Sequence, residues 1–319
     1  MNQPWVWKVL GLVVFLAGMI GCNGDEQASD DGKYTIVATV GMVGDIARNV
    51  AGEHAHVTVL MGEGTDPHLY RATSDDAKAL KNADVVFYNG LLLEGKMAEL
   101  LEQAAGDKPT IAVAEVVSED RLLGDDPHIW MDPQLWTAAI DAVEATLIAH
   151  DASNTDAYRA NAEAYRAEVA ALGEYGTRTL ATIPTDRRIM ITSHDAFQYF
   201  GRAFDLEVRG VQGLSTESEA GLQQVNALVD LIVEQQIQAV FVETSVPQKS
   251  IEALINGAKS RGHDVVIGGS LFSDAMGSAS TYEGTYVGML DHNITTVTRA
   301  LGGEAPAEGL NGKLSQNGD

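Results

Sequence analysis

Cysteine is almost absent from this sequence of 319 residues, which contains a single one, Cys22, near the N-terminus. No disulfide can form downstream of it, so packing alone must stabilise the folded part. Basic residues are also scarce, because 21 Lys and Arg stand against 45 Asp and Glu, giving a net charge of −24. The sequence shows no basic patch, and we therefore expect no nucleic-acid partner. The acidity suits cationic ligands, although solubility or a saline habitat is a commoner cause.

No apolar run in the sequence is long enough to cross a bilayer, which needs about 20 residues. Residues 9–20 are almost wholly apolar and follow Lys8, a pattern typical of a signal peptide. Cys22 comes directly after this segment and before a polar run. This arrangement resembles a lipoprotein signal, in which residues 1–21 are removed and Cys22 carries lipid. An uncleaved short anchor with an incidental cysteine is the alternative.

The remainder of the chain reads as a tether at 22–33 followed by two regions in which strands and helices alternate. Short apolar segments predict strands at 34–40, 56–61, 84–88 and 110–114, and later at 188–192, 206–211, 239–243 and 264–268. Amphipathic segments between and after them predict helices at 41–52, 73–82, 95–105, 133–150, 196–203, 221–236, 247–261 and 284–301. This alternation is typical of α/β lobes built on parallel sheets. We place the lobes at 34–153 and 185–301, and we expect a disordered tail at 302–319.

One long segment between the two regions does not follow this alternation of strands and helices. Residues 154–183 form a single helical pattern rich in Ala, Glu, Arg and Tyr, and Pro184 ends it. A helix of about 30 residues spans about 45 Å, which is the size of a whole lobe. The sequence is therefore ordered as a lobe, a long helix and a second lobe.

Three of the eight histidines have settings that favour metal binding. His68 and His128 both end an Asp-Pro-His tripeptide. Proline fixes its own φ and holds the preceding residue extended, so each histidine leaves a stiff loop suited to a positioned ligand. His194 lies directly after a predicted strand, at the edge of a parallel sheet where ligands bind. We expect the isolated histidines His54, His56, His150, His263 and His292 to be surface or core residues.

Asp274 is the fourth candidate ligand, because it also follows a predicted strand of the second lobe. Taken alone it would fit a turn or a helix N-cap. With the three histidines it completes a set of three imidazoles and one carboxylate, two from each lobe. Such nitrogen and oxygen donors suit zinc, manganese, iron, cobalt or nickel.

Six motifs make a resemblance to a known family specific. They are TDPH at 65–68, DPHIWMDP at 126–133, SHDAF at 193–197, GLSTESEAG at 213–221, LFSDAMG at 271–277 and GTYVGM at 284–289. In order and spacing the chain, over about residues 34–301, resembles the metal-binding lipoproteins of bacterial zinc/manganese ABC transporters, the TroA-like solute-binding proteins. The resemblance implies two α/β lobes joined by one long rigid helix, here 154–184, with a metal site in the cleft between them.

The resemblance further implies that His68, His128, His194 and Asp274 bind the metal and that Cys22 is lipidated. The protein would then be a monomer anchored outside the cytoplasm, in the periplasm or on the cell surface, and would deliver metal to the membrane permease of an ABC importer. Zinc-dedicated relatives often have a His-rich loop, but residues 113–126 contain no histidine. Manganese-dedicated relatives often have glutamate where this chain has His194. The set of three imidazoles and one carboxylate favours zinc, with manganese as the alternative metal.

Two other functions are considered. A zinc-dependent hydrolase usually has three protein ligands and one open position, whereas this chain offers four and lacks a His-Glu-x-x-His motif. We therefore expect no enzymatic activity, with Glu63, Glu217 and Glu243 as the bases that a hydrolase would have available. A surface adhesin with a structural metal is compatible with the same sequence.

Overall fold

The computed structural model describes residue 1 and residues 32–315. The expected signal segment 1–21, the expected lipidation site Cys22 and nearly all of the tether 22–33 lie outside the described residues. Across the described part, no helix combines the length and the apolar character needed to span a bilayer.

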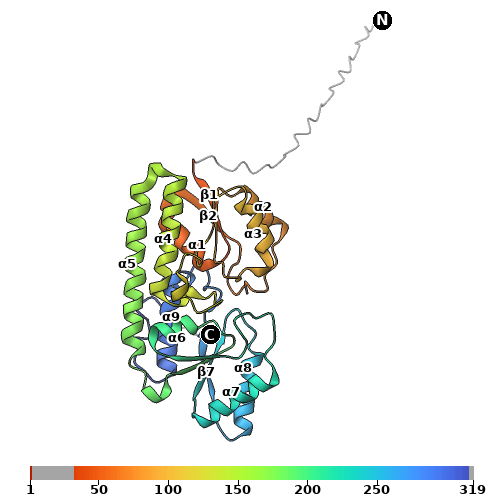
Figure 1. Ribbon diagram of the computed structural model, residues 1–319, viewed down its shortest axis with the longest axis vertical. Coiled ribbons are helices and arrows are strands. Elements are labelled where there is room, and N and C mark those ends of the chain that lie inside the picture. Colours follow the sequence, from red (N-terminus) through yellow and green to blue (C-terminus); the bar gives the residue numbers. More distant parts are fainter. Residues whose placement is uncertain (2–31, 316–319) are drawn as a thin grey trace. The chain divides into compact units, whose positions relative to one another are not determined.

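The first lobe is built on a four-stranded parallel sheet with the strand order β2-β1-β3-β4. The strands are β1 (Tyr34–Ala38), β2 (Ala55–Val59), β3 (Val85–Tyr88) and β4 (Thr110–Ala112). Helices α2 (Ser74–Asn82) and α3 (Ala98–Ala105) lie on one side, and α1 (Gly41–Ala51) and α4 (Pro133–His150) on the other (Figure 1). Coverage of both faces explains why the central strands read as continuous apolar runs.

The second lobe contains two parallel strand pairs, β5–β6 and β7–β8. Their bounds are β5 (Ile189–Thr192), β6 (Glu207–Gly210), β7 (Ala239–Glu243) and β8 (Val266–Leu271). The helices are α6 (Gln198–Phe204), α7 (Leu222–Glu234), α8 (Lys249–Ser260) and α9 (Tyr286–Ala300). Between residues 32 and 315, every strand and helix predicted from the sequence is present, and the two α/β lobes are confirmed.

The long helix α5 (Thr155–Leu180) runs along both lobes (Figure 1). Its 26 residues span about 39 Å, slightly less than predicted, because the chain leaves the helix before Pro184. Helix α5 packs against α1 and α4 of the first lobe and against α6 and α9 of the second. One apolar core runs continuously from the first lobe through α5 into the second. A smaller core lies between β7 and helices α7 and α8.

The C-terminal segment differs from the expectation of a disordered tail over the residues that the structure describes. The backbone N–H of Leu310 donates to Asp291, the N–H of Ser315 donates to Glu283, and Leu314 is buried. The glycine-rich, polar composition concealed two leucines, and burying them helps to hold residues 302–315 against α9.

Gly176 is a point of close approach between α5 and the second lobe. A Cβ atom placed there would lie 2.6 Å from the ring of Phe204 in α6 and 3.0 Å from Ile294 in α9. Phe204 is buried and packs on Phe200 with ring centroids 4.8 Å apart, so a methyl group at position 176 would have to displace a packed ring. Three residues earlier, a Cβ at Gly173 would meet Pro133 at 3.5 Å, which is an ordinary contact.

We predict opposite effects of alanine at these two glycines of the same helix. Gly176→Ala should lower the free energy of unfolding by about 1–3 kcal/mol, because the added methyl group overpacks the junction. Gly173→Ala should raise it by up to about 1 kcal/mol, because alanine is the better helix former and has room. Urea denaturation of both variants measures this. Equal effects of the two substitutions would contradict a tight junction at Gly176.

Candidate metal centre

The two Asp-Pro-His tripeptides form the same local structure in the first lobe. The backbone N–H of His68 donates to Asp66 Oδ1 at 2.9 Å, and the N–H of His128 donates to Asp126 Oδ1 at 2.9 Å. In each case the aspartate side chain closes a turn over the intervening proline, which has no N–H to donate. Both histidines therefore leave stiff loops, as the sequence predicted. His68 lies between β2 and α2, and His128 lies just before α4.

The second lobe supplies the other two side chains from the carboxyl ends of its strands. His194 follows β5, and Asp274 follows β8. His194 is held by Glu243, the last residue of β7, whose two carboxylate oxygens accept from its backbone N–H at 2.8 Å and contact its ring Nδ1 at 2.5 Å. The strands of each pair are parallel and β5 lies against β7, so their carboxyl ends meet although they are far apart in the sequence.

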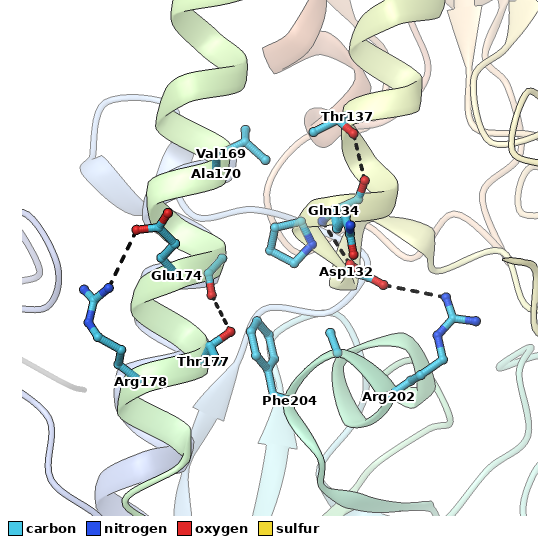
Figure 2. A pocket seen from close by; sticks show the side chains of 13 residues that line it. Asp132, Gln134, Thr137, Val169, Ala170, Glu174, Thr177, Arg178, Arg202 and Phe204 are labelled. Carbon is cyan, nitrogen blue, oxygen red and sulfur yellow. Dashed lines mark hydrogen bonds and ion pairs between the residues drawn. The ribbon is translucent and has the colours of Figure 1, made fainter.

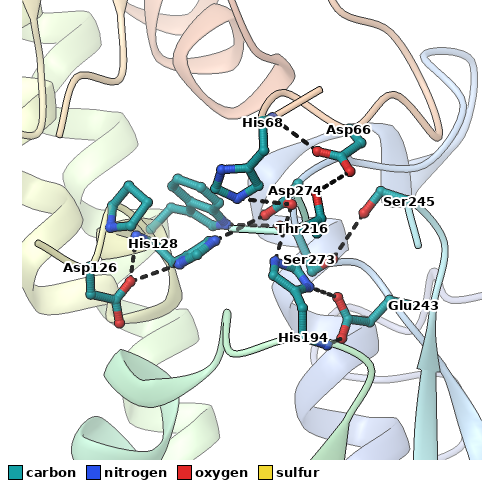
Figure 3. Close-up of polar contacts among 12 residues, drawn as sticks. Asp66, His68, Asp126, His128, His194, Thr216, Glu243, Ser245, Ser273 and Asp274 are labelled. Atoms are coloured by element: carbon teal, nitrogen blue, oxygen red, sulfur yellow. Dashed lines mark hydrogen bonds and ion pairs between the residues drawn. The ribbon is translucent and has the colours of Figure 1, made fainter. Parts of the chain in front are cut away.

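The structure brings all four predicted side chains together (Figure 3). Each offers one potential ligand atom, and these atoms lie within 4.8 Å of one another. Asp274 approaches Nε2 of His194 at 3.2 Å, of His128 at 3.3 Å and of His68 at 3.7 Å. All four residues are buried, yet the three Nε2 atoms and both Asp274 oxygens have no hydrogen-bond partner within the described chain. Buried polar atoms without partners are rare and costly, and here they converge on one point.

Zinc(II) and related ions fit this set. Three neutral imidazoles and one carboxylate are nitrogen and oxygen donors without thiolate, the set that borderline divalent metals accept. A cation between the five unpartnered atoms would satisfy all of them at once. No other cluster of at least three potential metal ligands occurs within the described residues.

The electrostatics of the site are governed by carboxylates around the rings. Burial alone would lower the pKa of His128, but contacts with Asp126 and Asp274 outweigh it and raise that pKa to about 9. Burial likewise opposes the charge on His194, and Glu243 and Asp274 raise its pKa well above the ordinary value. The two imidazoles in turn hold the pKa of Asp274 well below its usual range, against the effect of burial.

His68 differs from the other two rings. Burial is the largest influence on His68 and lowers its pKa. The neighbouring imidazoles lower this pKa further, and Asp274 raises it by less than the lowering influences combined. Asp66 contacts the backbone of His68, whereas Asp126 and Glu243 contact the ring Nδ1 of their histidines. The site thus combines two rings fixed by carboxylates with a third that favours the neutral form.

Sequence reasoning missed the role of these supporting carboxylates. The sequence could have indicated a supporting role for Asp126, because it lies two residues before His128 and the same spacing recurs at Asp66 and His68. Glu243 was considered only as a base for a hydrolase, but it contacts His194. Of the other candidate bases, Glu217 forms an ion pair with Lys96, and Glu63 is exposed.

Several hydrogen bonds join the lobes around the site. Trp130, whose ring lies against His128, donates from Nε1 to the carbonyl of Ser273 at 3.0 Å, directly before Asp274. Thr216 of the second lobe donates to Asp66 Oδ2 at 2.5 Å, next to the turn that carries His68. The relative position of the four side chains is therefore fixed from both lobes.

A groove of about 730 Å³ lies elsewhere, between the start of α4, the C-terminal half of α5 and the end of α6 (Figure 2). Its walls carry two ion pairs, Arg202 with Asp132 and Arg178 with Glu174. None of the four converging side chains lines it. The groove lacks a comparable set of convergent, unpartnered polar atoms.

Comparison with known proteins identifies metal-binding relatives that match nearly the whole chain. Residues 36–300 match the family described as zinc-uptake complex component A periplasmic. The manganese-binding lipoprotein MntA of Bacillus subtilis (strain 168) is 46% identical over 290 residues, which cover 89% of this chain and 95% of that protein. The zinc-binding protein TroA of Treponema pallidum (strain Nichols) is 42% identical over 291 residues, covering 90% and 94%.

The fold agrees with these sequence matches. The solved structure of the periplasmic zinc-binding protein TroA from Treponema pallidum superimposes with a TM-score of 0.83 and 43% identity, and the match covers 85% of this chain and 99% of that one. This chain thus combines the sequence similarity with two α/β lobes, a long helix and four convergent side chains. The chain therefore belongs to the zinc-uptake complex component A family.

Proposed function

We propose that this protein captures one divalent transition metal ion outside the cytoplasm and delivers it to an ABC importer. The observation that carries the proposal is the convergence of three buried imidazole nitrogens and two carboxylate oxygens that lack hydrogen-bond partners. His68, His128, His194 and Asp274 are the proposed ligands. Relatives named as metal-binding or substrate-binding lipoproteins of metal ABC transporters support the delivery step. The family consists of solute-binding proteins, and we propose no catalytic role.

The proposed location rests on the N-terminal sequence and on the relatives named as lipoproteins. Residues 1–21 would be removed, Cys22 would carry lipid, and the monomer would remain tethered to the membrane beside the importer's permease. Mass spectrometry of the membrane-extracted chain tests this point. An acylated cysteine at the new N-terminus supports it, and an uncleaved, unmodified chain contradicts it.

Alanine substitutions test the ligand assignment. His68→Ala, His128→Ala and His194→Ala should each weaken zinc binding by at least about 100-fold, because each removes a positioned donor from a buried site. The exposed His150 provides the control, and His150→Ala should bind zinc as the unsubstituted protein does. Competition titration against a chelator measures all four. Native affinity in any of the three site variants would remove that residue from the proposed set.

Metal uptake by this site should be an exchange of protons for metal. A ligand imidazole must be neutral at the atom that binds, but the pKa values of His128 and His194 are raised in the metal-free site. Both rings would therefore carry protons at neutral pH, when Asp274 is ionised. Two protons would leave as one divalent ion enters, so the net charge of the buried site would stay constant.

The pH dependence of binding follows from this exchange. A reference imidazole pKa of about 6.5 would confine proton competition to the region below pH 7, whereas the raised pKa values extend it upward toward pH 9. Zinc affinity should rise by up to about 100-fold per pH unit between about pH 7 and 8, since two protons are displaced. Calorimetry in buffers of different ionisation enthalpy counts those protons.

Glu243→Gln provides the matched variant for the proton count. It removes the carboxylate that most raises the pKa of His194, so the number of protons released at pH 7.5 should fall from about two toward one. Binding without proton release in the unsubstituted protein would contradict the exchange.

The donor set also bears on which metal is carried. Three imidazoles favour zinc over manganese, because manganese has the lowest intrinsic affinity in the divalent series. Manganese prefers more oxygen donors, and Asp274 could supply two if both of its oxygens bind. The cargo in the cell would further depend on which free ion is available. We propose zinc as the tighter ligand and manganese as an alternative cargo.

Exchange of one donor tests this argument. A glutamate at position 194 would lie beside Glu243, so the informative variant is the double substitution His194→Glu with Glu243→Gln. By replacing nitrogen with oxygen it should narrow the zinc-to-manganese affinity ratio. The single variant Glu243→Gln is its control. Competition titration with both ions gives the ratios, and tighter manganese binding by the unsubstituted protein, or a wider ratio in the double variant, would contradict the donor argument.

A further inference from the structure

Exposed apolar side chains are concentrated where strands of the two lobes end. Among residues 32–315, the exposed large apolar side chains are Leu69, Leu92, Val116, Leu222, Val266 and Ile267. The first three lie on the segments that follow β2, β3 and β4, and Leu222 begins the helix after β6. The segments after β2, β5 and β8 carry His68, His194 and Asp274. Four of the six exposed side chains thus lie on segments that follow strands, as His68, His194 and Asp274 also do.

Leu92 stands out because of its backbone. Gly90, Leu91 and Leu92 have φ values of 87°, 50° and 63° in succession. Glycine adopts this left-handed conformation readily, but leucine rarely does, because its Cβ crowds the backbone. The side chain of Leu92 is nevertheless 80% exposed, so no burial within the described chain offsets the strain. Strained residues of this kind occur mainly at functional positions.

The strained turn is held by a buried carboxylate. Glu94 accepts hydrogen bonds from the backbone N–H of Asn89 at 2.8 Å, from the N–H of Gly90 at 3.1 Å and from the hydroxyl of Thr39 at 2.6 Å. Leu93 is fully buried beside it. A turn whose backbone is fixed in this way presents Leu92 at a defined position, so that ordering the backbone would cost little entropy when a partner binds.

The same turn is connected to the metal centre. The side chain of Asn89 donates to the carbonyl of Pro127 at 3.0 Å, one residue before His128. On the other side, Lys96 forms an ion pair with Glu217, which belongs to the second-lobe segment that contacts the His68 turn through Thr216. A partner seated on Leu92 would therefore lie beside segments that hold ligands from the first lobe and beside the segment that joins the two lobes.

We propose that the turn at residues 90–93 is a docking element and that Leu92 inserts into an apolar socket on the extracytoplasmic surface of the importer's membrane subunit. This inference rests on the proposed function, because a partner that receives the metal must cover the segments that enclose it. A rigid, exposed apolar side chain beside a functional site is typical of a binding anchor. The segments after β2, β4 and β6 also carry exposed acidic residues, among them Glu63, Glu115 and Glu219, and fewer exposed basic ones, Arg71 and Arg121. The socket should accordingly have a basic rim.

The test uses the zinc-loaded full-length protein and the purified membrane subunits of its metal importer in proteoliposomes. Leu92→Asp should weaken docking at least about tenfold and reduce zinc uptake into the vesicles, because a charge cannot enter an apolar socket. Val266→Asp is the matched control, since Val266 is 61% exposed but lies at the amino end of β8, away from Asp274. Both variants should bind zinc with native affinity.

A second variant distinguishes docking from a purely structural role. Leu92→Gly relieves the left-handed strain, so its unfolding temperature should not fall, while its docking should weaken as in Leu92→Asp. Native docking by Leu92→Asp would overturn the inference and leave the proposed function intact. If the zinc-loaded unsubstituted protein showed no saturable binding to the importer, the delivery function would fail together with the inference. Self-association lost in Leu92→Asp with unchanged docking would assign the turn to a second copy instead, and would also overturn it.

Discussion

The burial of the Asp274 carboxylate among three imidazole rings is the constraint on which the centre of this molecule depends. A charge out of water is stable only when opposite charge and hydrogen bonds compensate for lost hydration. Asp126 and Glu243 add two further negative charges behind the rings. These carboxylates favour positive charge among the rings, and in the proposed exchange that charge comes either from protons on two imidazoles or from one divalent ion. Under this proposal the same buried geometry would serve both the protonated and the metal-bound state.

The two lobes must hold the four converging side chains in fixed relative positions, and the long helix is only part of the reason that they do. The carboxylate of Asp45 in α1 accepts from the hydroxyl of Tyr165 in α5 at 2.6 Å and from the N–H of Tyr286 in α9 at 3.1 Å. One buried group thus joins the first lobe, the long helix and the second lobe, within an apolar core that is continuous across them. A wide hinge opening would have to break this core, so small local movements suit this architecture better.

Much of this structure could be predicted from residue patterns, because strand and helix periodicities are local. The four converging side chains could be chosen because Asp-Pro-His turns and strand-end positions are also readable locally. The contact of Glu243 with His194 could not be, since it joins residues 49 positions apart on neighbouring strands. The left-handed backbone conformation of Leu91 and Leu92 could not be predicted from the sequence either, because leucine rarely adopts it. The sequence there predicts a helix from position 95, and a 3-10 helix at Gly95–Met97 does lead into α3 at Ala98, but nothing in it indicated the left-handed residues just before.

X-ray absorption spectroscopy of the zinc-loaded protein at the zinc edge tests the central claim most directly. The account predicts three imidazole nitrogens at about 2.0–2.1 Å and one or two carboxylate oxygens at about 2.0–2.2 Å, with no sulfur neighbour. The spectrum should lose one imidazole contribution in His194→Ala. A zinc environment with fewer than three imidazoles in the unsubstituted protein, or one made mainly of water oxygens, would contradict it.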